Sequence, residues 1–144
     1  MRMWGIIFSI IAGAAMSFQG VINTRLGERI GLLEANTFVQ GTAFLLSLLA
    51  VWWFGSGNFR AIVDAPKIYW FAGVLGLIIT VTVMLGIRDL SPTVAISTIL
   101  ISQLLVAALI DAFGILGSEQ VTFNWTKYIG IALMIGGVVV FKIK

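Results

Sequence analysis

Five apolar stretches, separated by short polar segments, divide this chain. They cover residues 4–22, 32–54, 68–87, 93–113 and 125–141. A helix needs about 20 mostly apolar residues to cross the hydrocarbon core of a bilayer. We therefore expect an all-α integral membrane protein, with five transmembrane helices in a single domain over residues 1–144.

The segments between these stretches are short. They comprise residues 25–31, 55–67, 88–92 and 114–124. The third contains Pro92, which we place at a helix start, where the missing N–H of proline costs little. The first apolar stretch is too long for the core of a signal peptide, so we expect it to be retained as a helix.

The composition agrees with this membrane assignment. Hydrophobic residues make up 60% of the chain and charged residues only 10%, against about 45–50% and about 25% in soluble domains. The net charge of +3 comes from scattered basic residues, so we expect no nucleic acid partner. The chain has no cysteine and no histidine, which removes thiolate ligands and the commonest general base. We therefore expect no enzyme activity, cofactor or metal, and the remaining chemistry suits solute binding and translocation.

The basic residues are almost evenly divided between the two sides of the membrane. With five spans, one side has four Lys/Arg and the other has five. This distribution sets orientation in short-loop proteins, so a nearly balanced chain is able to insert both ways up. We expect two copies in opposite orientations to form an antiparallel dimer. Its two chains would be related by a pseudo-two-fold axis in the membrane plane, like the inverted repeats of larger transporters. The alternatives are a single orientation or a homologous partner subunit. The two groups are Arg2, Arg60, Lys67 and Lys127 on one side, and Arg25, Arg29, Arg88, Lys142 and Lys144 on the other.

Small residues predict helix-packing or dimer contacts at two places. In the first stretch, small residues recur every four positions, a spacing that lets another helix approach closely. The fifth stretch has glycines but no polar residue in its core, which favours packing over a solute path. The residues concerned are Gly5, Ser9, Gly13 and Ser17 in the first stretch, and Gly130, Gly136 and Gly137 in the fifth.

Polar side chains within the spans are the candidates for solute binding. Gln19 and Asn23 are four residues apart near the end of the first stretch, so they share a helix face. The fourth stretch is the most polar and contains Thr98, Ser102 and Gln103. An unpaired amide at membrane depth is costly, so Gln103 must face the protein interior. These groups either contact a solute or hydrogen-bond to neighbouring helices.

Two carboxylates are candidates for charge coupling. Glu34 opens the second stretch, where the helix dipole alone stabilises a negative charge. Asp111 lies near the end of the fourth stretch, where its charge opposes the dipole, so its position requires a reason. A salt bridge to a basic loop residue is one explanation, and a cation or proton site is the other.

These motifs together resemble the YdcZ-like five-helix family of the drug/metabolite transporter (DMT) superfamily. The run from Gln19 to Gly27 is similar to that family's Gln-x-x-x-Asn-x-x-Leu signature. Further matches are Gly41, the segment Ser102-Gln103-Leu104-Leu105, the end Asp111-Ala112-Phe113-Gly114, and the glycines Gly130, Gly136 and Gly137. Ser102 stands where the family commonly has glycine, and Glu34 stands where small residues are usual.

The resemblance implies an antiparallel homodimer or heterodimer equivalent to one ten-helix DMT transporter. It also implies a multi-pass protein of the inner (plasma) membrane. From the amides within the spans and the nearly balanced basic residues, we expect a transporter, an exporter, that moves a small organic solute by alternating access. Under this hypothesis Gln19, Asn23, Thr98, Ser102 and Gln103 bind the solute, and Glu34 or Asp111 couples charge. The alternatives are a small dual-topology channel and a non-transporting assembly or accessory protein.

Overall fold

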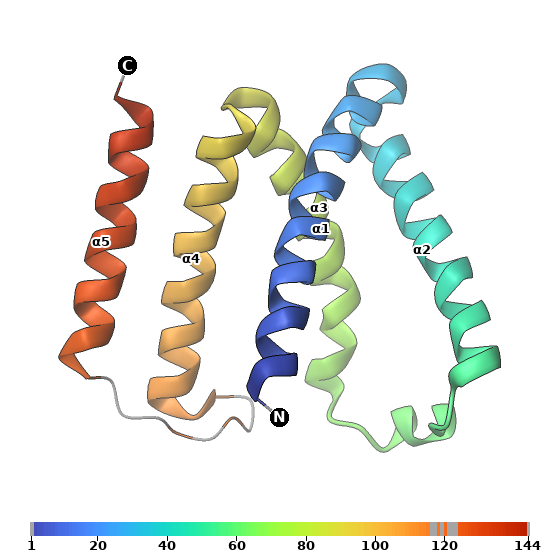
Figure 1. Ribbon diagram of the computed structural model, residues 1–144. Coiled ribbons are helices and arrows are strands. Elements are labelled where there is room, and N and C mark those ends of the chain that lie inside the picture. Colours follow the sequence, from blue (N-terminus) through green and yellow to red (C-terminus); the bar gives the residue numbers. More distant parts are fainter. Residues whose placement is uncertain (1, 116–117, 119, 121–123, 144) are drawn as a thin grey trace. The chain divides into compact units, whose positions relative to one another are not determined.

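The computed structural model describes residues 2–115, 118, 120 and 124–143, and these are helical apart from short connections (Figure 1). The five α-helices are α1 (Arg2–Ile30), α2 (Leu32–Phe54), α3 (Ala72–Asp89), α4 (Pro92–Phe113) and α5 (Trp125–Lys142). Two short 3₁₀ helices, η1 (Phe59–Val63) and η2 (Lys67–Phe71), lie between α2 and α3. The predicted all-α class is confirmed. The chain forms two compact units, Met1–Arg88 and Asp89–Lys144.

Four of the helical segments are long and apolar enough to cross a membrane. They are Met3–Ile30, Leu32–Phe54, Lys67–Asp89 and Pro92–Phe113. The apolar part of α5, Trp125–Phe141, is shorter, so the fifth span stays a prediction. Large apolar side chains such as Phe38 and Trp53 are exposed along the helices, as expected of surfaces that contact lipid.

The predicted connector at residues 25–31 is wrong, because α1 continues to Ile30 and leaves only Gly31 outside a helix. Hydropathy falls at Arg25, but no proline occurs before Gly31, and α1 runs through its earlier glycines. Arg25 Nη1 also donates to Glu28 Oε2 at 3.0 Å across one helical turn, a spacing that supports the helix. The apolar stretch therefore missed the end of the helix.

Gly31 joins α1 to α2 through a conformation that side chains disfavour. Its φ is 104° and its ψ is 149°, a region populated almost only by glycine. Its N–H donates to the Gly27 carbonyl at 3.0 Å, and its own carbonyl accepts from the Ala35 N–H at 3.0 Å. The Glu34 carboxylate folds back over Gly31 and occupies the place of a Cβ. This single residue therefore reverses the chain.

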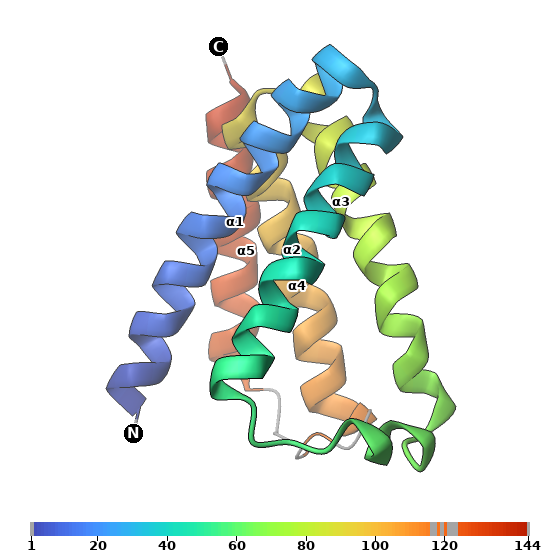
Figure 2. The ribbon, with the colours of Figure 1, turned by 90° about the vertical axis from the view of Figure 1, so that its right-hand side faces the viewer.

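Helices α1 and α2 meet at Gly31 and diverge toward their other ends (Figures 1 and 2). Within this unit the buried residues gather near the meeting point, which we call the junction end. They are Gly20, Asn23 and Thr24 of α1, Ala35 and Asn36 of α2, and Met84 and Ile87 of α3. Tight packing in the first unit is therefore confined to one end of its helices.

The remaining connections show how local side chains set helix boundaries. Ser91 caps α4 by accepting from the Val94 N–H at 3.4 Å, and Pro92 occupies the first turn as predicted. Helix α4 ends at Gly114, which has a left-handed φ of 61°, a common helix stop. The predicted third stretch starts as η2, and α3 itself begins at Ala72.

In the second unit, α4 packs against α5.

Candidate functional site

The junction end buries three polar side chains inside an apolar cluster. Asn23 is 3% exposed, Thr24 is 5% exposed and Asn36 is 5% exposed. The Thr24 hydroxyl donates to the Gly20 carbonyl at 2.8 Å, so its donor is satisfied within α1. Two predicted binding residues lie on α1. Asn23 is buried, whereas Gln19 is exposed on the helix surface.

Asn36 was missed as a site residue by sequence reasoning, and it is the most unusual polar group of the junction end. Its Oδ1 is buried and accepts no hydrogen bond from any described part of the chain. A buried acceptor without a donor costs about 1–3 kcal/mol. A signal was present, because Leu32, Ala35, Asn36 and Val39 share one face of α2 and Asn36 is the only polar member.

Two glycines let α1 approach α3 at this end. A Cβ added at Gly20 would lie 2.8 Å from Ile87 Cδ1 and 3.2 Å from Val83 Cγ1. A Cβ added at Gly27 would lie 2.6 Å from Met84 Cε. These separations are shorter than ordinary carbon contacts. Within the first unit, the packed small-residue face of α1 therefore comprises Gly20 and Gly27.

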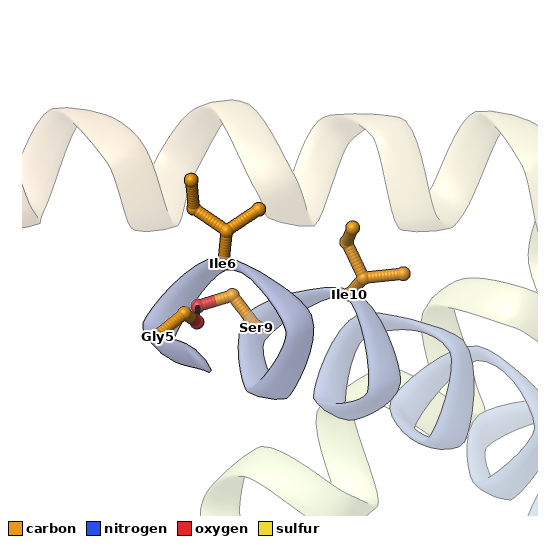
Figure 3. Close-up of a pocket in the computed structure, with 4 residues that line it drawn as sticks. All are labelled: Gly5, Ile6, Ser9 and Ile10. Carbon is orange, nitrogen blue, oxygen red and sulfur yellow. Dashed lines mark hydrogen bonds between the residues drawn. The ribbon is translucent and has the colours of Figure 1, made fainter. Parts of the chain in front are cut away.

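The predicted stripe near the start of α1 is open in the single chain. Among the described residues, nothing lies within 4 Å of a Cβ built at Gly5 or Gly13. The Ser9 and Ser17 hydroxyls donate to the Gly5 and Gly13 carbonyls at 2.8 Å and 3.0 Å. Figure 3 shows Ser9 beside Gly5 in an open hollow also lined by Ile6 and Ile10. Because the Ser9 hydroxyl already donates a hydrogen bond to the Gly5 carbonyl, this hollow offers few polar groups to a ligand.

The other predicted binding residues lie in the second unit, on α4. Thr98, Ser102 and Gln103 are all exposed. Thr98 Oγ1 donates to the Val94 carbonyl at 2.8 Å, which occupies its only donor. Gln103 therefore offers the most hydrogen-bonding capacity on this part of α4, with both a donor and an acceptor group. On α5, a Cβ at Gly130, Gly136 or Gly137 would meet no described atom within 4 Å.

The two predicted charge-coupling residues occupy different environments. Glu34 is exposed in the first turn of α2, where the helix dipole stabilises a carboxylate. Asp111 is partly buried near the end of α4. Within the described ranges the structure shows no ion pair for Asp111, and Arg25–Glu28 is a separate pair at the junction end. The roles of Glu34 and Asp111 in charge coupling stay predictions.

Comparison with known families adds the decisive observation. The sequence model of a family described as "Putative inner membrane exporter, YdcZ" matches residues 4–140. The chain belongs to the YdcZ family. This membership confirms the resemblance to YdcZ-like proteins and is consistent with the DMT superfamily. Searches of curated proteins and of solved structures returned no match.

YdcZ membership and the apolar helices together identify a multi-pass inner-membrane protein. The family description supports a membrane transporter in general terms. An exporter family is also consistent with the expectation that the chain is not an enzyme.

Proposed function

We propose that this YdcZ protein is one subunit of an inner-membrane exporter that moves a small organic solute by alternating access. The observation that carries the proposal is the match to an exporter family over residues 4–140. Asn23 and Gln19 on α1, with Thr98, Ser102 and Gln103 on α4, supply the solute-binding groups. Asp111 or Glu34 supplies the charge coupling.

The working unit is a pair of chains in opposite orientations, either two copies or one copy and a homologous subunit. All five helices span the bilayer. Helix α5 has 18 residues and rises about 27 Å, close to the hydrocarbon thickness of about 30 Å. An odd number of spans places the termini on opposite sides, and the Lys/Arg division of four to five permits both insertions. The open glycine faces of α1 and α5, at Gly5, Gly13, Gly130, Gly136 and Gly137, are the contact surfaces we assign to the partner.

Topology mapping tests the pairing. A tag at the C-terminus should be accessible from both sides of the membrane in a mixed population, because the charge bias is one residue. A chain found in a single orientation when expressed alone would contradict the homodimer and require a partner subunit.

A flux assay tests the export function. Purified protein in liposomes should move at least one member of a panel of cationic, neutral and anionic organic solutes. Replacing Gln103 with leucine should lower this flux by about tenfold, equivalent to ~1.4 kcal/mol of lost binding or transition-state stabilisation. The matched control is Ser47→Ala on α2, because the Ser47 hydroxyl is exposed and already donates to the Ala43 carbonyl at 2.8 Å.

The same assay separates the alternative functions. A channel would give large single-channel currents that do not saturate with solute concentration. An accessory protein would show no flux across the panel, and its cellular function would survive Gln103→Leu. Either result would contradict the exporter.

A further inference from the structure

The unpartnered acceptor of Asn36 distinguishes it from the other short polar side chains of the first unit. The hydroxyls of Thr24, Thr37 and Thr80 each donate to a backbone carbonyl one turn earlier, at 2.8–2.9 Å. Asn36 is 5% exposed, and its Oδ1 has no donor within the described residues. A carboxamide oxygen only accepts hydrogen bonds, so the group that completes it must be a donor.

The junction end does not supply that donor from a buried charge. Its buried residues are neutral, and the charged groups nearest in sequence, Glu34 and Arg29, are exposed. Arg25, which is also exposed, is paired with Glu28 at 3.0 Å. An anionic group would be repelled by the carboxamide oxygen, which carries a partial negative charge. A ligand N–H group, either a cationic ammonium or a neutral amide, fits this site.

The packing around Asn36 suits a site that opens. A Cβ at Gly20 or Gly27 would meet α3 only at terminal side-chain atoms, those of Val83, Ile87 and Met84. Gly27 also lies near Leu32 and Ala35 of α2. The helices α1 and α2 already diverge away from Gly31 (Figure 2). A modest separation of α1 and α3 at the junction end would therefore break no ion pair and no inter-helix hydrogen bond that the structure shows there.

We propose that Asn36 Oδ1 is the acceptor of a binding site for an N–H donor of the transported solute, a primary ammonium or an amide. The solute reaches it when α1 and α3 separate at the junction end, where Asn23 is also buried. This assignment rests on the proposed export function, because it takes the ligand to be the transported solute. Under this proposal, Asn36 favours solutes that carry an N–H donor over anionic solutes.

The absence of cysteine in this chain permits a clean reporter of ligand binding. Ala35→Cys places a single thiol on a residue that is fully buried, so N-ethylmaleimide reacts only when the junction end opens. In liposomes, methylammonium or acetamide should change the alkylation rate by at least about fivefold, the factor that mass action gives at about four times the Kd. Tetramethylammonium, which has no N–H, and acetate, which is an anion, should leave the rate unchanged.

Variants of Asn36 decide whether its oxygen is responsible. Asn36→Leu and Asn36→Ala should abolish the effect of the donor probes, whereas Asn36→Asp should retain the effect of methylammonium. Thr37→Val is the control, because Thr37 is exposed and its hydroxyl is bonded to the Leu33 carbonyl at 2.9 Å. Two apolar variants are used so that a folding defect in one does not decide the result.

Three outcomes would overturn the proposal. They are an equal effect of tetramethylammonium, an undiminished effect in both apolar variants, and no effect of either donor probe, which would mean that water alone completes the acceptor. A comparison of methylammonium with acetamide identifies which donor class binds. If the donor probes change the alkylation rate but no solute flux is found, the exporter is contradicted and the binding site at Asn36 is not. If flux is found but the donor probes have no effect, only the binding site is contradicted.

Discussion

Replacing Gly20 with leucine should lower the free energy of unfolding by about 2–3 kcal/mol, near the upper end of the usual cost of overpacking. At this position even a Cβ would lie 2.8 Å from Ile87 Cδ1 and 3.2 Å from Val83 Cγ1. Ile87 is buried, so the leucine cannot be accommodated by moving one exposed side chain. Helices α1 and α3 must separate, and packing at the junction end is lost. Titration of the purified protein with a denaturing detergent, followed by helix content, measures the change.

The same helix provides the control. Gly13→Leu introduces an identical side chain seven residues earlier, where no described atom lies within 4 Å of a Cβ. In the isolated subunit its effect should stay within about 0.5 kcal/mol, as at other surface positions. Equal losses in the two variants would show that the Gly20 contact contributes nothing specific. A large loss only in a reconstituted pair would assign Gly13 to the partner interface.

Replacing Gly31 with asparagine should cost about 1–3 kcal/mol through backbone strain. Asparagine tolerates the left-handed helical region, but Gly31 lies outside that region, with φ 104° and ψ 149°. A side chain there must also displace the Glu34 carboxylate, which folds over the residue. The α1–α2 reversal has no other residue to absorb the strain, because both helices reach Gly31 directly.

Gly114→Asn is the matched variant for this prediction. Gly114 ends α4 with φ 61° and ψ 33°, in the left-handed region that asparagine adopts at helix ends. We expect it to cost only a few tenths of a kcal/mol, or about 0.5 kcal/mol at most. Thermal unfolding monitored by circular dichroism compares the two variants. A Gly31→Asn protein as stable as Gly114→Asn would refute the strain argument.

The positions of the helices could be predicted from the sequence, whereas several of their ends could not. Each of the five apolar stretches coincides with a helical segment, and four of these segments are long and apolar enough to cross a membrane. Helix ends depend on local backbone chemistry instead. Pro92 correctly predicted the start of α4. The continuation of α1 to Ile30 depends instead on the lack of a proline before Gly31, which hydropathy does not indicate.

The candidate site was harder to predict, because burial depends on where helices meet. Gly5, Gly13, Gly20 and Gly27 all look alike as small residues on α1. Only Gly20 and Gly27 pack within the first unit, because the Gly31 turn brings the helices together at that end. The burial of Asn36 could not be predicted, because it too depends on where the helices meet. From the sequence alone, an asparagine near a helix start resembles a surface residue.

The length of α1 has a consequence for the depth of the polar cluster. With 29 residues, α1 rises about 43 Å, which exceeds the hydrocarbon thickness of about 30 Å. With Arg2 at one boundary of the hydrocarbon, the other boundary falls close to Asn23. The carboxamides of the junction end then lie near the level of the lipid headgroups. A polar solute leaving this cluster would enter the headgroup layer directly, without first crossing the acyl chains.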